Sequence, residues 1–550
     1  MRTQLNLSAR EAPIVVIGAG IGGLAAALRL AAEGRPVLVL EKNPAPGGKM
    51  RSVPSAAGPI AAGPTVVTMR AVFDDLFAAA GEALEDHVDI TQERVLARHF
   101  WPDGAQLDLF ADHAESVAAV RAFAGEAEAK RFERFSERAR RLFDAFDAPM
   151  MQAAKPDFLK LAGVALSSPA MLPTLAPWAT LARALRAELR DPRLRQLFGR
   201  YATYVGGSPF EAPAVLSLIW EAEARGVWRI DGGLARLARA IAALAETRGA
   251  TFQYGAAVDA IETKDGRVAA VRLGSGERVP ASAILFNGDP AALRDGLLGE
   301  DPRRAVPRAA TAPRSLSAYV WSFAAAPTGP SGSPAPLLHH NVYFGHAQRA
   351  EFAALKAGRM PEDPTLYICA QDRGDGLASP APGALERFEI IMNGPPTQPG
   401  SPQETGARRR DHEVRTDQEE LAQCSDRTFQ TLEAMGLSFT PTPAATAPHL
   451  STPTDFASRF PGSRGSLYGR SPHGLTASFA RPTARTAIPG LYLAGGGAHP
   501  GAGVPMAALS GKLAAEAIGR DLVSRSKLRP TATRGGISTV SARTGAAPSR

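Results

Sequence analysis

The sequence predicts an α/β protein with a Rossmann-like domain, and three separated blocks of the chain carry that prediction. The first block, residues 13–41, holds a short apolar strand, a glycine-rich turn, a helix and a second strand. The second block, residues 231–289, contains a helix, a hairpin and short strands. The third block, residues 489–518, is a strand that enters a glycine-rich turn and then a helix. We expect the three blocks to form one domain.

The first block has the residues that a dinucleotide-binding turn requires. Residues 13–17 read as a buried strand, and a helix follows the turn. Gly18 permits the tight turn, Gly20 lets the backbone approach a pyrophosphate, and Gly23 lets helix and strand pack closely. Glu41 ends the second strand, 18 residues after Gly23, where its carboxylate can accept hydrogen bonds from a ribose diol. A glycine-rich turn without a ligand is the alternative interpretation.

A second glycine pair favours FAD over NAD as the dinucleotide. Gly47 and Gly48 lie just after the second strand and are followed by Lys49. A glycine pair beside basic residues suits a further approach to the phosphates of the cofactor. NAD dehydrogenases generally lack this loop, whereas FAD enzymes of the glutathione-reductase-like class commonly have it. We therefore expect Gly48 and Lys49 at the cofactor, with an ordinary Pro/Gly surface loop as the alternative.

The other two blocks add expected cofactor contacts. In the second block, Asn287 follows an apolar strand, and Val258 is a candidate for backbone contact with the adenine. Asp231, just before a glycine pair, predicts a helix N-cap. In the third block, the turn and its helix would place backbone N–H groups and a helix dipole against the flavin. The contacts expected from that turn are Gly495, Gly496, Gly503 and Val504.

Composition narrows the class of protein. The chain has 550 residues, of which 45% are hydrophobic and 21% charged, so a disordered or fibrous protein is excluded and two to four packed units are expected. Residues 1–11 lack the apolar core of a signal peptide. Cys369 and Cys424 cannot form a disulfide framework, which fits a reducing compartment. The pair His339–His340 has no carboxylate or cysteine at a metal-ligand spacing, so no metal is expected.

The positive charge of the chain is concentrated at its end. The formal net charge is +8, and six of these charges belong to residues 522–550, which contain no acidic residue. Residues 1–521 therefore carry a net charge of only +2, so no nucleic-acid partner is expected. Residues 522–550 show no apolar periodicity and are predicted to form a disordered basic tail.

Further motifs resemble those of the bacterial phytoene desaturase family of carotenoid desaturases, over residues 14–518. They are Ala62-Gly-Pro-Thr-Val-Val67, His339-His-Asn-Val-Tyr-Phe344, Thr365-Leu-Tyr-Ile-Cys369 and Gly469. Residues 495–510, Gly-Gly-Gly-Ala-His-Pro-Gly-Ala-Gly-Val-Pro-Met-Ala-Ala-Leu-Ser, look most like the hydroxyneurosporene, or 1-hydroxycarotenoid 3,4-, desaturases. Two positions depart from the family pattern: Ala61 stands where an acidic residue is common, and Lys49 where arginine is usual.

The resemblance implies a fold of the amine-oxidase and phytoene-desaturase type, in which the FAD-binding domain is assembled from separated parts. The expected order is a first FAD-binding part in residues 12–110, a helical membrane or substrate subdomain in 111–224, a second FAD-binding part in 225–300, an α+β substrate-binding domain in 301–479 and a C-terminal FAD-binding part in 480–521.

The resemblance also implies FAD-dependent dehydrogenation of a carbon–carbon single bond beside a polyene in carotenoid biosynthesis. The expected reaction is 3,4-desaturation of a 1-hydroxycarotenoid such as hydroxyneurosporene. Flavin takes a hydride from one carbon, and a proton leaves the neighbouring carbon. His499 is the first candidate to accept that proton, and fixing the loop by hydrogen bonds is its alternative role. Quinone or oxygen is the expected electron acceptor.

A carotenoid substrate would have to be drawn from a membrane, because apolar burial is worth about 0.8 kcal/mol per methylene group. Residues 131–200 interleave phenylalanines with arginines, around the uncharged stretch 161–182, in which three prolines argue against a spanning helix. This pattern predicts either a basic-rimmed patch on a membrane or a helical cap packed on the core. The resemblance favours the membrane, so we expect a cytoplasmic protein associated peripherally with the inner membrane.

Other functions of the same fold are alternatives. They include a phytoene desaturase or carotenoid isomerase of the same family, an amine oxidase, and a non-enzymatic binder similar to the Rab GDP-dissociation inhibitors. Amine oxidases cage the amine between aromatic residues near the flavin, but aromatic residues make up only 7% of this chain and the C-terminal motif has no such pair. The intact glycine fingerprint with Glu41 argues against the binder.

Overall fold

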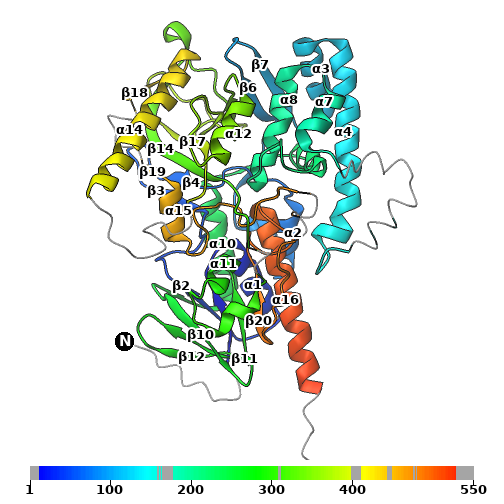
Figure 1. The fold of residues 1–550 in the computed structure, drawn as a ribbon, viewed down its shortest axis with the longest axis vertical. Coiled ribbons are helices and arrows are strands. Elements are labelled where there is room, and N and C mark those ends of the chain that lie inside the picture. Colours follow the sequence, from blue (N-terminus) through cyan, green and yellow to red (C-terminus); the bar gives the residue numbers. More distant parts are fainter. Residues whose placement is uncertain are drawn as a thin grey trace, which may run out of the picture.

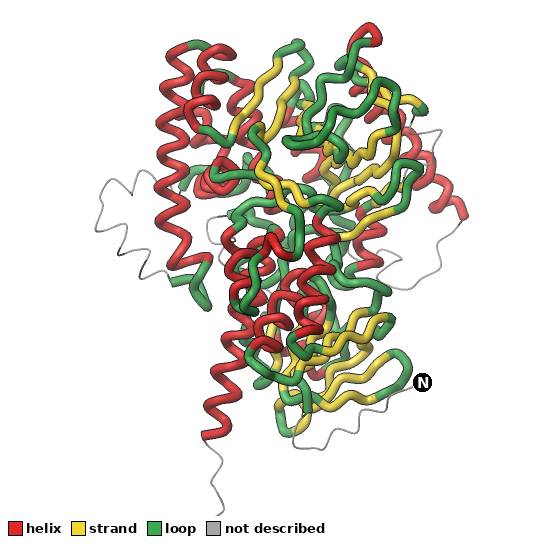
Figure 2. The backbone as a smooth tube through the Cα atoms, turned by 180° about the vertical axis from the view of Figure 1, so that it is seen from behind, coloured by secondary structure: helices red, strands yellow, loops and turns green. Residues whose placement is uncertain are grey.

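The computed structural model describes residues 12–157, 178–307, 311–397, 411–442, 449–474 and 480–527, together with residues 160, 163 and 477. A parallel sheet with its helices forms one end of the molecule, and a second sheet and a group of helices lie side by side at the other end (Figure 1). Figure 2 shows the same division from behind, with the strands gathered in the two ends of the molecule.

A five-stranded parallel sheet brings together the three blocks predicted from the sequence. Its strands are β1 (Ile14–Ile17), β2 (Val37–Glu41), β9 (Thr251–Tyr254), β13 (Ala283–Phe286) and β20 (Leu491–Leu493). Their order is β20-β13-β1-β2-β9, so segments far apart in the chain become neighbours. The central strands are apolar and buried, as parallel strands covered on both faces must be.

The parallel sheet separates two apolar cores. Val16 and Val39 pack with helices on one face, whereas Val15 and Leu38 pack on the other face against a small antiparallel sheet, because successive side chains of a strand point to opposite faces. The helices on the first face are α1 (Ile21–Ala32), α2 (Ala71–Ala78), α10 (Leu234–Thr247) and α16 (Val504–Lys527). The antiparallel sheet is formed by β10 (Val258–Lys264), β11 (Arg267–Leu273) and β12 (Arg278–Pro280).

The second sheet has the order β18-β14-β17-β16-β15-β6-β7, with β19 paired to β14. Its strands are β6 (Val95–Phe100), β7 (Gln106–Phe110), β14 (Ser317–Thr328), β15 (His340–Tyr343), β16 (Leu366–Ala370), β17 (Glu386–Gly394), β18 (Ser438–Thr440) and β19 (His449–Ser451). The expected domain boundary at residue 110 is therefore wrong for β6 and β7. They leave the cofactor-binding part because β6 hydrogen-bonds in parallel to β15.

The helical group packs around an aromatic core. Phe132 and Phe135 of α4 contact Phe198 of α8, and Phe132 and Phe198 also contact Trp220 of α9. The interpretation of the α4 phenylalanines as a membrane patch is thus wrong, because Phe132 and Phe135 are buried in this core and Phe143 and Phe146 are buried on the wall of an internal cavity. The helices are α3 (His113–Ala124), α4 (Glu126–Phe146), α7 (Leu181–Glu188), α8 (Pro192–Gly199) and α9 (Leu218–Ala224), with the short turns η2 (Asp147–Met151), η3 (Arg200–Val205) and η4 (Ala214–Ser217).

Short elements complete the described chain. They are β3 (Arg51–Val53), β4 (Ile60–Ala62), η1 (Leu84–Asp86), β5 (Ile90–Gln92), β8 (Trp228–Ile230), α11 (Pro290–Arg294), η5 (Asp301–Ala305), η7 (Pro330–Gly332), α12 (Gln348–Lys356), α14 (Asp411–Ala434) and α15 (Pro453–Arg459). Among the helices of the described residues, none is long and apolar enough to cross a membrane.

Two local predictions differ from the structure. Asp231 is not the N-cap of α10, because the helix begins after Gly233 and the Asp231 carboxylate pairs with Arg229. The predicted disordered tail begins too early, because α16 continues to Lys527 and Leu522 packs against the core. The remainder of that tail, residues 528–550, lies outside the described residues, as does most of the 161–182 stretch.

Candidate active site

One cavity of about 860 Å³ lies where the parallel sheet, the second sheet and the helical group meet. Every residue expected at the cofactor except Gly23 lies on its wall. These residues are Gly18, Gly20, Glu41, Gly48, Lys49, Val258, Asn287, Gly495, Gly496, Gly503 and Val504. The structure therefore brings together, in one place, residues from all three predicted blocks.

The β1–α1 turn is shaped for backbone approach. A Cβ on Gly20 would lie 2.9 Å from Asn287 Nδ2, and one on Gly23 would lie 2.3 Å from the Gly18 carbonyl oxygen. Gly23 thus lets the helix start close to the strand. Asn287 secures this turn by donating to the Gly18 carbonyl oxygen over 3.0 Å. The N-terminus of α1 lies on the cavity wall at Gly20, Ile21 and Gly22, which suits a pyrophosphate.

Glu41 is held with both carboxylate oxygens in defined positions. Its side chain is buried, Oε2 accepts from the backbone N–H of Ala19 over 2.7 Å, and Oε1 accepts from the backbone and side-chain nitrogens of Asn43. A carboxylate oxygen has lone pairs for more than one donor, so the ribose hydroxyls of a dinucleotide can bind beside these contacts. The geometry fits the ribose role predicted for Glu41.

The C-terminal turn closes the opposite side of the cofactor cradle. The backbone N–H of Gly495 donates to Ser510 Oγ of α16, and Arg481 donates to the carbonyl oxygen of Gly496 over 2.7 Å. A Cβ on Gly495 would lie 2.8 Å from Asn287 Oδ1, an atom that is buried without a hydrogen-bond partner among the described residues. The closely spaced glycines and this unpartnered acceptor fit a flavin dinucleotide bound between the two turns.

Lys49 lies on the wall of the cavity and contacts the segment that follows α15. Its Nζ donates to the Leu467 carbonyl oxygen and lies 5.2 Å from the centre of the Phe460 ring. Burial lowers the pKa of Lys49 to about 8, with the attraction of Asp289 opposing the shift. Lys49 therefore joins the cofactor loop to the substrate side of the cavity, a contact that the sequence did not predict.

His499 is buried on the cavity wall, and its ring is already engaged. Its Nε2 lies 2.9 Å from the Ala153 carbonyl oxygen, so Nε2 carries the hydrogen and only Nδ1 is left as an acceptor. Burial also lowers the pKa of His499. This geometry suits the loop-fixing role, and proton acceptance by His499 stays a prediction.

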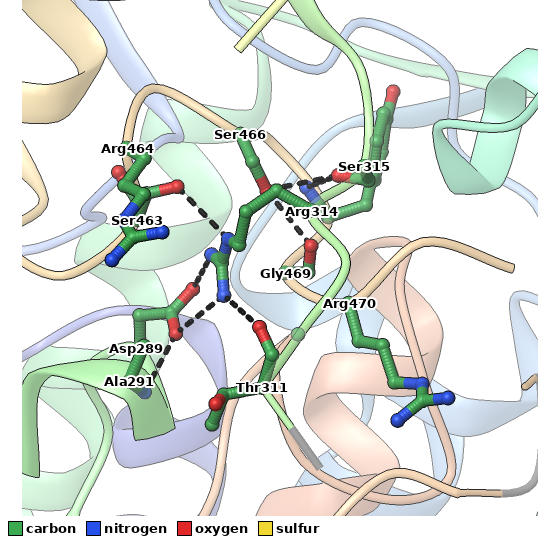
Figure 3. A network of polar contacts seen from close by, with 12 residues as sticks. Asp289, Ala291, Thr311, Arg314, Ser315, Ser463, Arg464, Ser466, Gly469 and Arg470 are labelled. Carbon is green, nitrogen blue, oxygen red and sulfur yellow. Dashed lines mark hydrogen bonds and ion pairs between the residues drawn. The ribbon is translucent and has the colours of Figure 1, made fainter. Parts of the chain in front are cut away.

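A buried ion pair that the sequence did not reveal joins the two sheets beside the cavity (Figure 3). Arg314, just before β14, contacts both oxygens of Asp289, which follows β13 and caps α11 through the Ala291 N–H. Both side chains are only 9% exposed. Arg314 also donates to the Ser463 and Thr311 carbonyl oxygens, so it ties three segments of the chain together.

A carboxyl group from β17 contacts the loop in which Ala61 stands where an acidic residue was expected. Glu389 Oε1 accepts from the backbone N–H of Gly63 over 2.6 Å, and Ala61 instead exchanges two hydrogen bonds with Gln371. Glu389 is fully buried, which holds the pKa of its carboxyl group well above the usual range. The 61–65 loop is thus positioned by the second sheet.

The rest of the cavity wall is mostly apolar, and much of it comes from the helical group and the second sheet. Its large side chains include Phe143, Phe146, Leu216, Ile219, Ile391 and Phe460. The α4 phenylalanines at the end of the helix therefore face this cavity. A dinucleotide cradle opening into an apolar chamber is the arrangement of a flavin-dependent oxidoreductase that acts on an apolar substrate.

Comparison with known proteins agrees with that class. Residues 21–321 and 388–519 match the family described as flavin containing amine oxidoreductase, and the chain belongs to this family. It is 55% identical to the hydroxyneurosporene desaturase of Cereibacter sphaeroides, over 94% of this chain and 99% of that protein. It is 50% identical to the hydroxyneurosporene desaturase of Rhodobacter capsulatus, with the same coverage. The chain is therefore a member of the carotenoid desaturases, an FAD-dependent oxidoreductase.

Solved structures share the fold. An oxidoreductase from Methanosarcina mazei superposes with a TM-score of 0.53 at 16% identity, over 92% of this chain and all of that one. Cyclohexylamine oxidase from Brevibacterium oxydans superposes with a TM-score of 0.52 at 19% identity, over 93% of this chain and all of that one. At these identities the likeness establishes the architecture of the FAD-binding fold.

Proposed function

We propose that this protein introduces the 3,4 double bond into a 1-hydroxycarotenoid such as hydroxyneurosporene. The observation that carries the proposal is the single cavity in which the dinucleotide cradle continues into an apolar chamber. Relatives at 50–55% identity are named hydroxyneurosporene desaturases, which supports this substrate over phytoene. An amine substrate would need a polar or aromatic cage, whereas apolar side chains dominate the substrate side of this wall.

Each part of the cavity has a task in that reaction. When bound, FAD supplies the hydride acceptor. The glycine turns and Glu41 would hold the dinucleotide, and the apolar wall would align the polyene and exclude water. Lys49 and the Asp289–Arg314 pair hold the loops that close the chamber. We assign reoxidation of the flavin to quinone or oxygen.

The substrate assignment predicts a spectral change. Purified protein with FAD and liposomes that contain hydroxyneurosporene should lengthen the conjugated system, which moves the carotenoid absorbance to longer wavelength. Liposomes that contain phytoene are the matched control and should give less than a tenth of that rate. Conversion of phytoene with no change in the hydroxycarotenoid would contradict the assignment.

We propose further that the protein takes its substrate from the cytoplasmic face of the inner membrane. Trp178 is 88% exposed, and Arg183 and Arg186 on the following helix α7 are exposed as well. An exposed tryptophan beside basic side chains suits the interface of an anionic bilayer. This short surface takes the place of the α4 phenylalanines as the membrane contact.

Replacing Trp178 with serine should weaken binding to vesicles of phosphatidylcholine and phosphatidylglycerol by about 10-fold, because an exposed aromatic ring would lose its apolar contact with the lipid. Vesicle co-sedimentation measures the change. Val523→Ser is the control, because Val523 is another exposed apolar residue, 43% exposed on α16, and its replacement should leave binding unchanged. Equal binding by Trp178→Ser and the unchanged protein would contradict this membrane contact.

A further inference from the structure

A second, smaller cavity of about 470 Å³ adjoins the reaction cavity. Thr65 lies on the wall of both cavities. The smaller cavity opens toward the surface, because its wall includes Leu377 and Leu385, which are 37% and 46% exposed. His339 and Cys369 also line it. Thr65 therefore marks the point where the two cavities meet.

A continuous chain of hydrogen bonds begins at Thr65. Thr65 Oγ1 lies 2.7 Å from the hydroxyl of Tyr367, which also lines the reaction cavity. The Tyr367 hydroxyl lies 2.6 Å from Nδ1 of His340. His340 is 2% exposed, and its Nε2 is buried without a hydrogen-bond partner among the described residues. Leaving a buried imidazole nitrogen without a hydrogen-bond partner costs free energy of folding. Its presence at the end of this series of hydrogen bonds therefore indicates a function.

The chain ends beside the smaller cavity. The rings of His340 and His339 are 4.5 Å apart, and His339 Nε2 lies 3.6 Å from Cys369 Sγ. His339 Nδ1 is 2.6 Å from the Arg373 carbonyl oxygen, which fixes the orientation of its ring. Polar atoms thus extend from Thr65 and Tyr367 on the wall of the reaction cavity to His339 and Cys369 on the wall of the smaller cavity.

The reaction requires such a route. Once a hydride has left the polyene, the neighbouring C–H bond is strongly acidic, so a hydroxyl oxygen is a sufficient base. The electrons of that C–H bond form the new double bond, and its proton must leave the chamber while the bound polyene displaces water from it. Among the charged and hydroxyl groups on the wall of the reaction cavity, Thr65 and Tyr367 belong to the series of hydrogen bonds that leads toward the smaller cavity.

We propose that Thr65, Tyr367 and His340 carry the substrate proton from the reaction cavity to the smaller cavity, an inference that rests on the proposed desaturation. Thr65 Oγ binds the proton and passes its own to the Tyr367 oxygen. Tyr367 passes its proton to Nδ1 of His340, and the Nε2 hydrogen of His340 leaves toward the smaller cavity on the side where the neighbouring His339 lines it. Rotation of the two hydroxyls and tautomerisation of the imidazole restore the chain.

The electrostatics suit transfer rather than storage of the proton. Burial, with the neighbouring His339 and Arg200, holds the pKa of His340 well below its usual value, so the imidazolium is short-lived. Burial raises the pKa of Tyr367 well above its usual value, so the phenol keeps a hydrogen between turnovers. Each member of the chain is therefore neutral at rest.

The same side chains resemble an incomplete metal site, contrary to what their spacing in the sequence suggested. The ligand atoms of His339, His340 and Cys369 lie within 4.8 Å of one another. Burial raises the pKa of the Cys369 thiol far above neutrality, and Arg200 and Arg229 act on the two imidazoles, so the surroundings disfavour a cation. The expectation that no metal binds stays a prediction, which the experiment below includes.

Two isosteric variants test the proton route in the FAD-loaded protein. Tyr367→Phe and Thr65→Val each remove a hydroxyl and keep the shape of the side chain. We expect kcat for hydroxyneurosporene to fall by about 100-fold or more, as for loss of general acid–base catalysis, while KM and the FAD content stay unchanged. In anaerobic single turnovers followed with a pH indicator, proton release should slow together with flavin bleaching. Tyr343→Phe is the control, since Tyr343 is buried in β15 and lines neither cavity.

Each outcome of this experiment decides between explanations. Unchanged kcat and proton release in both variants, or in the one that folds if the other does not, would overturn the proton route. A raised KM with normal kcat would also overturn it, because the hydroxyls would then be binding substrate. The proton route would also be overturned if the purified protein held one transition-metal ion per chain and the His340→Asn variant lost that ion. No turnover of any carotenoid by the unchanged protein would overturn the proposed function itself.

Discussion

Replacing Glu41 with alanine is expected to abolish stoichiometric FAD binding, with a loss of affinity of about 100-fold or more. Each hydrogen bond to a charged group is worth about 1.5–3 kcal/mol, and a ribose diol would make two of them. The substitution also leaves the buried Ala19 N–H without its acceptor, which loosens the turn that faces the pyrophosphate. The ratio of flavin absorbance to protein absorbance after gel filtration measures the effect, and titration with FAD gives the affinity.

Two further variants distinguish loss of the ribose contact from a general loss of protein stability. Glu41→Gln keeps the size of the side chain and one acceptor oxygen, so it should bind FAD with intermediate affinity. Glu33→Ala removes an exposed carboxylate at the end of α1, and it should bind FAD normally. Retention of stoichiometric flavin by Glu41→Ala would rule out the ribose role.

Replacing Arg314 with methionine should lower the free energy of unfolding by about 3–5 kcal/mol, because it leaves the Asp289 carboxylate buried without its partner. The lost contacts also release the Ser463 and Thr311 carbonyl oxygens on the loops beside the cavity. We expect a lower urea midpoint for the FAD-loaded protein, with flavin release in the same transition. Tryptophan and flavin fluorescence report the two events.

An exposed ion pair gives the matched comparison. Arg303 and Glu300 pair with side chains that are 46% and 83% exposed, so Arg303→Met should cost no more than about 1 kcal/mol. Asp289→Asn keeps an acceptor for the Ala291 N–H, and the double variant with Arg314→Met should cost less than the sum of the single variants. Equal effects for Arg314→Met and Arg303→Met would show that burial of the first pair contributes nothing.

The β1–α1 turn could be predicted from its local sequence pattern, whereas the surroundings of α4 could not. The phenylalanines of α4 recur at helical spacing, and that pattern is the same for a helix on a membrane and for one against a core. Contacts made in the folded structure, such as those of Phe132 with Phe198 and Trp220, determine that its ring is buried. Strands β6 and β7 present the same difficulty, because their sheet is set by pairing with β15, more than two hundred residues later.

The glycine turn of a dinucleotide-binding unit, a second glycine turn near the C-terminus and the class of cofactor could all be predicted from the residues alone. Gly18, Gly20, Gly23 and Glu41 lie within one βαβ unit, so local spacing along the chain is enough to place them together. The Asp289–Arg314 pair and the hydrogen bonds that link Thr65, Tyr367 and His340 could not be predicted from the sequence. Their partners come from segments that no local periodicity connects, and packing of the second sheet against the cradle brings them into contact.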